Sequence, residues 1–456
     1  MIASSPLVRR TFVLSSVGAV ALFAVAALRA PRTPPPVPLD RVHPGVPWTR
    51  LVPQLAPVEG VAGVRAADCG KCHERHYQEW KQSTHAHAYT DLQFQSEIAK
   101  PNQPAWLCLN CHIPVTNQRD EVVRSLIEGD LRRPVREVNP GFDPVMRDEG
   151  VTCAVCHVRK DERGRSYILG SVEGPKPPHP VRVDRAALLA RCNDCHDQTY
   201  RLTDALVCHF QSGSELRQGP EGETKQCADC HLPAVERPLV KDPGAPIRTA
   251  HVHGFVGGGV PKERDLLAAQ EALGYRPGLE VRFEVGTVEA ETVRVLAWLS
   301  NDRAGHFVPT GDPERHVLVE AELLDAGGQV LGRNALRIGQ QWVWEPVARQ
   351  VFDNRVAPGE TRVVVMDVKA GEERRQAFTP RPEWNVRSAP VPPGTGRPTR
   401  LRVTATHVRL SDDNAAWMRK NAAAADPRFA PGIARLLELY PSRRVFFSEE
   451  RALVVP

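Results

Sequence analysis

The sequence predicts a multidomain α+β fold, in which a mostly helical and irregular domain precedes a β-sandwich-like domain. Two observations carry this prediction. All eleven cysteines lie between residues 69 and 230, and ten of them belong to five copies of one short motif. After Gly259 the pattern changes to short runs in which apolar and charged residues alternate, as expected of half-buried strands. A chain of 456 residues also exceeds the usual size of one domain.

Residues 1–30 have the features of a signal peptide or a membrane anchor. Arg9 and Arg10 precede an uncharged stretch over residues 11–28, and Ala24-Val25-Ala26 is a small-residue cleavage site. The stretch is longer than the core of many signal peptides and shorter than the roughly 20 residues that span a bilayer, so both interpretations stay open. Residues 31–54 follow as a proline-rich linker, with seven prolines between residues 31 and 47, which favours an extended spacer without a core.

The five motifs, in a domain expected over residues 55–260, each read Cys-x-x-Cys-His. Their cysteines are Cys69, Cys72, Cys108, Cys111, Cys153, Cys156, Cys192, Cys195, Cys227 and Cys230, and their histidines are His73, His112, His157, His196 and His231. In this motif two thiols bond covalently to one haem, and the histidine binds its iron as proximal ligand. Zinc ribbons and disulfide scaffolds also pair cysteines, but neither requires a histidine after every pair. The sequence therefore predicts five covalently attached haem c groups.

The first cysteines of successive motifs are 39, 45, 39 and 35 residues apart. Such spacing leaves too little protein for a conventional core around each haem, so we expect the haems to form much of the buried apolar mass. Cys208, in Val207-Cys208-His209, resembles a motif that lacks its first cysteine. Attachment through one thioether stays open, although a packed free thiol is the favoured interpretation.

Residues 261–456 are expected to form the β-rich carboxy-terminal domain. The predicted strands are 279–285, 293–299, 317–324, 329–333, 361–368, 401–410 and 444–447, with Asp325-Ala326-Gly327-Gly328 as a hairpin turn. About seven short strands separated by turns are typical of a β-sandwich. Helical patches are predicted over 262–273, 412–422 and 432–440.

A haem iron with one histidine keeps an open sixth position, and eleven of the sixteen histidines remain to fill it. The five candidate distal ligands are His85, His87, His179, His253 and His306. His85 and His87 would point to opposite sides of an extended chain. Gly257 to Gly259, shortly after His253, permit close approach of the backbone to a macrocycle. Surface or satisfied polar roles are predicted for His43, His76, His316 and His407.

These features resemble the multihaem c-type cytochromes of the cytochrome c-552/4 type, which include the tetrahaem electron acceptor of hydroxylamine oxidoreductase. The resemblance covers roughly residues 65–325 and rests, beyond the motifs, on three segments: Trp80, Ser83 and His85; Glu149-Gly150-Val151; and Gly305-His306 with Pro309-Thr310-Gly311. It implies bis-histidine ligation of most haems, close haem packing and electron transfer outside the cytoplasm. His85 and His306, then His179 and His253, match the distal positions best. The pairing of histidines cannot be transferred, because this chain has five motifs instead of four.

The sequence thus favours an electron carrier in the periplasm or cell envelope. Its expected partners are redox proteins, either other cytochromes or a quinol or inner-membrane donor, and the net charge of +5 gives no case for nucleic acid. The alternative is a multihaem oxidoreductase that acts on a small nitrogen or sulfur compound at one open-site haem, although no Cys-x-x-Cys-Lys occurs. A third hypothesis gives the β-rich domain a role in docking or assembly.

Overall fold

The structure, a computed structural model, describes residues 34–42, 52–101, 103–172, 174, 177–261, 266–377, 386–390 and 396–454. Residues 1–30, predicted to be a signal peptide or anchor, lie outside this set, as does His43. Within the described ranges, no helix is long and apolar enough to cross a membrane. The chain divides into two compact units, of which the smaller contains residues 34–42 and 123–136 and the larger contains the other described residues.

The smaller unit is built on a three-stranded sheet of order β1-β2-β3. These strands are β1 (Pro36–Pro38), β2 (Glu121–Ile127) and β3 (Pro134–Val138), and helix α2 (Leu39–Val42) follows β1. The register pairs Val37 of β1 with Leu126 of β2. Part of the predicted linker is therefore a strand. Proline lacks a backbone N–H but is tolerated in an edge strand such as β1, which explains the difference from a free spacer.

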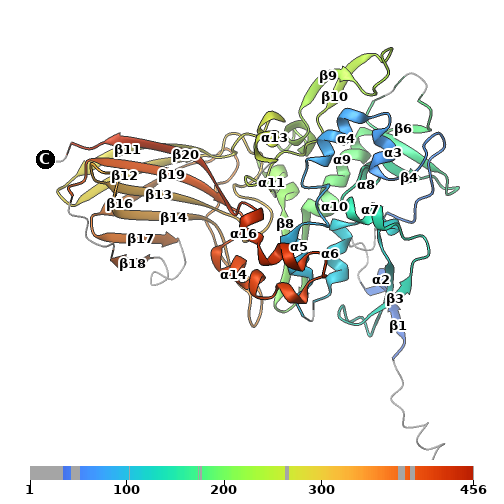
Figure 1. Ribbon diagram of the computed structural model, residues 1–456, viewed down its shortest axis with the longest axis horizontal. Helices are drawn as coiled ribbons and strands as arrows, with labels where there is room; N and C mark the ends of the chain where they lie inside the picture. The colour runs from blue at the N-terminus through green and yellow to red at the C-terminus, as the bar shows by residue number, and fades with distance from the viewer. Residues whose placement is uncertain are drawn as a thin grey trace, which may run out of the picture. The chain divides into compact units, whose positions relative to one another are not determined.

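The amino-terminal region of the larger unit consists of short helices and two- or three-stranded sheets (Figure 1). Its helices are α3 (Ala66–Gly70), α4 (Glu74–Lys81), α5 (Leu92–Ile98), α6 (Ala105–His112), α7 (Pro144–Asp148), α8 (Cys153–His157), α9 (Arg185–Leu189), α10 (Asn193–His196), α11 (Ser212–Gln218) and α12 (Cys227–His231), with 3-10 turns at Thr116–Gln118 and Ala190–Cys192. Its strands are β4 (Val158–Lys160), β5 (Ser166–Gly170), β6 (Val181–Val183), β7 (Asp197–Thr203), β8 (Leu206–Gln211), β9 (Ala234–Pro238) and β10 (Ile247–His251). The hydrophobic clusters among these elements are small, which agrees with the expectation that protein alone does not form the core here.

The carboxy-terminal region is a sandwich of two sheets (Figure 1). One sheet has the order β11-β12-β16, and the other has the order β18-β17-β14-β13-β19-β20, with β15 paired to β14. The strands are β11 (Glu280–Val288), β12 (Thr292–Ser300), β13 (His316–Leu324), β14 (Val330–Val343), β15 (Arg349–Asp353), β16 (Thr361–Lys369), β17 (Glu372–Ala377), β18 (Val386–Pro390), β19 (Arg400–Val408) and β20 (Arg443–Ala452). Each of the seven predicted strands has a counterpart here.

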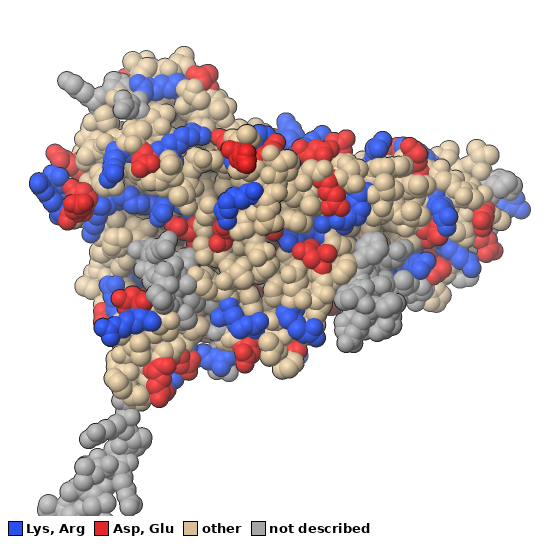
Figure 2. All heavy atoms as spheres, turned by 180° about the vertical axis from the view of Figure 1, so that it is seen from behind, with Lys and Arg blue, Asp and Glu red and all other residues tan. Residues whose placement is uncertain are grey.

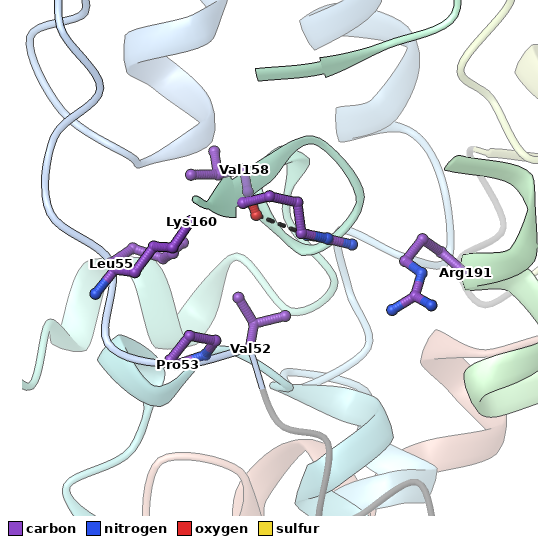
Figure 3. Close-up of a pocket in the computed structure, with 7 residues that line it drawn as sticks. Val52, Pro53, Leu55, Val158, Lys160 and Arg191 are labelled. Carbon is purple, nitrogen blue, oxygen red and sulfur yellow. Dashed lines mark hydrogen bonds between the residues drawn. The ribbon is translucent and has the colours of Figure 1, made fainter. Parts of the chain in front are cut away.

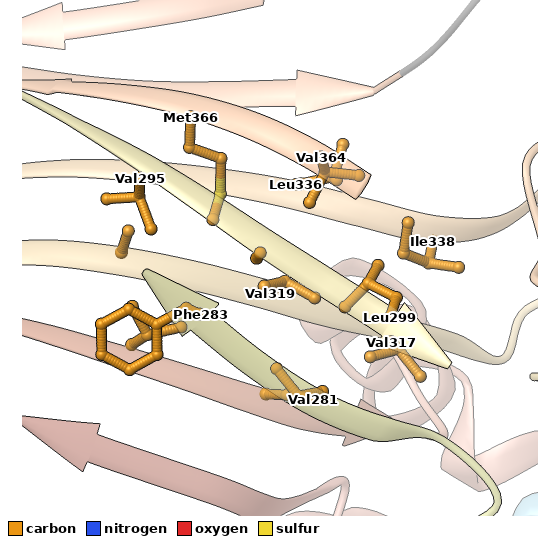
Figure 4. Close-up of a cluster of buried hydrophobic side chains, with 14 of the residues drawn as sticks. Val281, Phe283, Val295, Leu299, Val317, Val319, Leu336, Ile338, Val364 and Met366 are labelled. Atoms are coloured by element: carbon orange, nitrogen blue, oxygen red, sulfur yellow. The ribbon is translucent and has the colours of Figure 1, made fainter. Parts of the chain in front are cut away.

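The sandwich core lies between the two sheets, where alternate residues of facing strands interlock (Figure 4). Val295 of β12 and Val319 of β13 are fully buried, as are Leu401, Val403 and Ala405 along one face of β19. The period of two in the sequence therefore corresponds to one buried face per strand.

Four helices accompany the sandwich: α13 (Leu266–Ala272), α14 (Asp412–Lys420), α15 (Ala430–Ala434) and α16 (Leu436–Leu439). The last three contact the haem-motif region, because Leu92 at the start of α5 packs against the clusters that they form. The backbone N–H of Leu92 also donates to the Tyr440 hydroxyl at 3.2 Å. Helices and several sheets together agree with an α+β fold. The predicted boundary near residue 260 stays a prediction, since both regions belong to one compact unit.

Candidate haem-binding sites

Each Cys-x-x-Cys-His motif lies on a single short helical turn. The motif histidines end α6, α8, α10 and α12, and in the first motif the backbone N–H of His73 donates to the Cys69 carbonyl at 2.9 Å. Such a turn brings two thiols and one imidazole to the same place, as attachment to one haem edge requires. None of the eleven cysteines forms a disulfide, and within the described ranges no three or more Cys, His, Asp or Glu side chains are grouped as ligands of a bare metal ion.

Four of the motif imidazoles are oriented by a backbone carbonyl. The Nδ1 to carbonyl distances are 2.9 Å for His73 to Leu239, 2.6 Å for His112 to Ala88, 2.9 Å for His157 to Leu169 and 2.6 Å for His231 to Val256. A neutral imidazole that donates from Nδ1 has its Nε2 lone pair available for a metal. These contacts therefore fix the tautomer that a proximal ligand needs.

Four predicted distal histidines each lie opposite a motif histidine. The ring centres are 6.5 Å apart for His73 and His179, 6.1 Å for His196 and His85, 6.2 Å for His157 and His253, and 6.2 Å for His231 and His306. Two metal–nitrogen bonds of about 2.0–2.1 Å, plus the distance from each nitrogen to its ring centre, give a separation of roughly 6 Å. The spacing thus suits one metal ion between the two rings of each pair.

Burial favours the neutral form of several of these imidazoles. It lowers the pKa of His85 to about 3 and the pKa values of His196 and His253 to about 4, with neighbouring histidines as smaller causes. The pKa of His306 is also lowered by burial. Metal ligation needs the neutral form, so the folded protein presents these side chains ready to bind.

The loop that carries His85 is held by the segment before the third motif. Trp80 Nε1 donates to the Val151 carbonyl at 2.8 Å, and the Val151 N–H donates to the His85 carbonyl at 2.9 Å. Gly150 has φ +62°, and a Cβ there would lie 2.6 Å from the His85 carbonyl oxygen, so only glycine fits. Two of the segments that carry the family resemblance thus form one support for His85.

Glu149, in the same segment, joins the first and third motifs. Its carboxylate accepts from the Ala66 N–H at 2.9 Å, at the start of α3, and from the Thr152 hydroxyl at 2.8 Å, directly before α8. A carboxylate at a helix N-terminus satisfies an otherwise unpaired N–H. One acid therefore positions two motif turns.

His253 is positioned by a buried ion pair between Glu79 and Arg237. Arg237 donates to both carboxylate oxygens of Glu79, through Nη1 to Oε1 and through Nη2 to Oε2 at 2.7 Å. The His253 N–H donates to Glu79 Oε2 at 2.8 Å. His253 Nδ1 lies 2.8 Å from the His251 carbonyl, which leaves Nε2 for a metal.

The loop that carries His306 is fixed by buried polar groups of neighbouring elements. Asn301 Nδ2 donates to the His306 carbonyl at 2.9 Å. Thr310 Oγ1 donates to Glu215 Oε2 at 2.6 Å, and the other oxygen of Glu215 accepts from Arg355 Nη1 at 2.6 Å. The Glu215 and Arg355 side chains are only 5% and 6% exposed. A loop of the sandwich therefore places a histidine opposite His231 of the fifth motif, and buried polar contacts hold this loop.

Gly257 and Gly259 each pack closely against a histidine ring. A Cβ at Gly257 would lie 3.1 Å from Cε1 of His231, and a Cβ at Gly259 would lie 2.7 Å from Cγ of His407. The glycines therefore let this loop pack against one motif histidine and against one histidine of the sandwich.

The second motif is framed differently. The His112 ring stacks on Phe94, with centres 3.6 Å apart and planes inclined by 6°. His87 Nε2 lies 3.1 Å from the Lys81 carbonyl oxygen, and the role of His87 as a distal ligand stays a prediction. Cys208 forms no disulfide and lies near Cys108 and Cys111, and burial raises the pKa of its thiol to about 12. Its interpretation as a packed thiol stays a prediction.

Two histidines differ from the surface or satisfied polar role that the sequence predicts for them. His76 and His407 were interpreted as surface or satisfied residues, but His76 Nδ1 and His407 Nε2 are buried without a hydrogen-bond partner. The His76 ring lies 4.9 Å from His253 and 6.0 Å from His73. Its position three residues after His73, at the start of a helix, was the sequence signal for this proximity.

Thiols of different motifs interact pairwise, which shows how the motifs neighbour one another. The interacting pairs are Cys69 with Cys153, Cys111 with Cys195, and Cys192 with Cys227. Cys156 of the third motif also acts electrostatically on Cys192 of the fourth. The first motif therefore adjoins the third, the third adjoins the fourth, and the fourth adjoins both the second and the fifth.

A cavity of about 130 Å³ lies beside the third motif (Figure 3). It is lined by Val52, Pro53, Leu55, Val158, Arg159, Lys160 and Arg191. Arg159 Nη1 donates to the Val158 carbonyl at 2.6 Å. None of the paired histidines lines this cavity.

Comparisons with known proteins support the interpretation of the five motifs as haem-attachment sites. The family model described as "Cytochrome c554 and c-prime" matches residues 68–133, which contain the first two motifs. A penta-heme cytochrome c552 from Thermochromatium tepidum aligns over 87% of this chain and 100% of its own, with a TM-score of 0.53 and 18% identity, so the two share a fold. These findings support a multihaem c-type cytochrome. No curated protein sequence matches the chain. A beta-glucuronidase from glycoside hydrolase family 2 aligns over 38% of this chain and 11% of its own with a TM-score of 0.15 and 8% identity, too weakly for any argument.

The residues fit covalently bound haem c. Each motif turn presents two thiols and an imidazole, and four of these imidazoles face a second one at a spacing that suits a single metal ion.

On the face shown in Figure 2, basic and acidic side chains are interspersed.

Proposed function

We propose that the chain is an exported pentahaem cytochrome that carries electrons between redox partner proteins through haems with two histidine ligands. The four imidazole pairs support this proposal most directly. The assigned proximal and distal ligands are His73 with His179, His157 with His253, His196 with His85, and His231 with His306.

Bound haem supplies one-electron chemistry at its iron. Two imidazoles offer the same donors to both oxidation states of the metal, so little protein movement accompanies the exchange of an electron. The carbonyl contacts of Nδ1 keep each ring in one orientation, and burial excludes water from the ligands. The residues are thus arranged for electron transfer with small reorganisation.

The contacts between motif thiols support a route of transfer as well. We infer an order from the first motif through the third to the fourth, with the second and fifth as branches beside the fourth. The expected partners are other cytochromes or a quinol or inner-membrane donor.

Location in the periplasm or cell envelope is part of the same proposal. It is supported by the basic residues and uncharged stretch of the amino terminus and by the attachment chemistry that the five motifs imply. Sequencing the amino terminus of the purified native protein separates a cleaved signal from a retained anchor. A native protein that stays in the cytoplasm would contradict this part of the proposal.

The ligand assignment is tested by His306→Ala, with His316→Ala as a control in the same sandwich. We expect both variants to retain five haems by intact mass, because the thioethers do not depend on either side chain. His306→Ala should convert one haem from low to high spin in the EPR spectrum of the ferric protein, and His316→Ala should not. An unchanged spectrum of His306→Ala would contradict a ligand role. Binding of hydroxylamine, nitrite or sulfite to the unmodified ferric protein would favour the oxidoreductase hypothesis instead.

A further inference from the structure

Three nitrogen atoms at one end of the sandwich are buried without a hydrogen-bond partner. They are Nε of Arg315, Nε of Arg409 and Nε2 of His407. Arg409 is 3% exposed and His407 is 9% exposed. These three side chains, here called the Arg315–Arg409 cluster, act electrostatically on one another, since Arg315 contributes to lowering the pKa values of both His407 and Arg409 after the larger effect of burial. Native proteins rarely leave such donors without an acceptor.

Within the described residues, the two arginines of the cluster form no ion pair with an acid. Arg409 Nη1 donates only to the Pro261 carbonyl at 3.1 Å, and its guanidinium lies over the Tyr440 ring at 5.4 Å. Asp91 is the acid that acts on Arg409, and it does so electrostatically and more weakly than burial. A buried guanidinium that no carboxylate contacts is costly, and Asp91 offsets the charge of Arg409 only in part, so the cluster points to a further anion.

Neighbouring arginines show the contrast. Arg444, next to His407, binds the Glu271 carboxylate. Arg402, further along β19, donates through Nη2 to Glu322 at 2.6 Å. Both of these cations have their own acid, whereas the two in the cluster do not.

The cluster lies beside haem-motif residues. A Cβ at Gly258 would lie 3.5 Å from Arg315 Nη1, and the two flanking glycines pack on His231 and His407. Arg315 also acts electrostatically on His196, the motif histidine of α10. The positive charge of the cluster therefore lies beside the glycine loop, which packs on His231 of the fifth motif, and it also acts on His196 of the fourth.

We propose that the Arg315–Arg409 cluster is a carboxylate-binding site, and that its carboxylate is a propionate group of a haem beside the glycine loop, held by His231 or His196. A guanidinium matches a carboxylate through parallel N–H bonds, and His407 Nε2 adds a further donor. A free anion such as inorganic phosphate has related chemistry and is the alternative occupant. The proposal rests on the haem binding of the proposed function, and it assigns to the sandwich a second task besides supplying His306.

The test compares Arg315→Gln and Arg409→Gln with Arg315→Lys, Arg409→Lys and the control Arg402→Gln, all as full-length protein. Intact mass first counts the haems, and a potentiometric titration then gives their midpoint potentials. Loss of a cation next to a propionate favours the more positive ferric iron. Each Gln variant should therefore lower the potential of one haem by about 59 mV or more, a tenfold change for one electron. The Lys variants should retain most of the original potential, and the control should not change it.

Four results would overturn the proposal. Fully loaded Gln variants whose potentials move no more than that of Arg402→Gln, or Lys variants that shift as far as the Gln variants, would leave only a structural role for the arginines. Potentials of the unmodified protein that respond to added inorganic phosphate, with the response lost in the Gln variants, would assign the site to a free anion. A chain that carries no haem would overturn this proposal together with the proposed function, so the mass measurement distinguishes the two failures.

Discussion

Removing the Glu215 carboxylate should loosen the loop that presents His306. In the structure Glu215 accepts from Arg355 Nη1 and from Thr310 Oγ1, both at 2.6 Å, and its side chain is 5% exposed. Breaking a buried ion pair by removing one partner costs about 3–5 kcal/mol, because the other charge stays buried. Asp353 also contacts Arg355, at 2.8 Å, and we expect this second ion pair to remain in Glu215→Ala. We therefore expect a loss of stability near the lower limit, about 3 kcal/mol.

The assay is urea unfolding followed by circular dichroism, with the covalently attached haems in place. For a slope of about 2 kcal/mol/M, the midpoint should fall by about 1.5 M. The matched control is Glu450→Ala, since the Glu450 and Arg400 side chains are each 37% exposed, and a surface pair contributes about 0–1 kcal/mol. A high-spin EPR signal should accompany the change in Glu215→Ala only. Equal, small shifts in the two variants would refute the account of how His306 is held.

Two further predictions concern backbone fit and pH. Gly150→Ala should destabilise the fold by roughly 2–4 kcal/mol, because the new methyl adds a backbone clash to a left-handed φ. The control Gly164→Ala, with φ +77° and nothing within 4 Å, should lose only the free energy that a left-handed φ costs an alanine. Equal losses of the two variants in urea unfolding would contradict this. Burial lowers the pKa of His316 from 6.5 to about 4. The contribution of neutral His316 to the free energy of unfolding is fully present above pH 6.5. It is lost as the pH falls towards 4, by about 3 kcal/mol. The free energy of unfolding should therefore fall less steeply between pH 6.5 and pH 4 in His316→Gln than in the unmodified protein. Identical pH profiles of the two proteins would contradict the lowered pKa of His316.

The features that the sequence predicts well are local ones. The motif turns follow from fixed spacing along the chain, and strands such as β12 and β19 follow from alternation of apolar residues on one buried face. Strand β17 escaped prediction because its residues, Glu372 to Ala377, are almost all polar, so its pairing with β14 depends on the neighbouring strand. Strand β1 escaped because proline composition outweighed an edge position that only the folded chain reveals.

The candidate site shows the same division. Five candidate distal histidines could be proposed from the sequence, but the motif histidines that four of them face could not, since His85 faces His196 and His306 faces His231 only through tertiary packing. The roles of Glu149 and Glu215 were also hidden, because a carboxylate that positions a ligand resembles any other acid in the sequence. That a buried nitrogen such as Arg409 Nε has no hydrogen-bond partner can be recognised only in the folded structure, because its neighbours come from other parts of the chain.

The central claim, that four haems have two histidine ligands, is tested most directly by an EPR spectrum of the purified ferric protein, with intact mass measured on the same sample. The account predicts five haems by mass and low-spin signals from at least four of them. High-spin signals from two or more haems would contradict it, because they would require at least one of the four imidazole pairs to lack a shared metal ion.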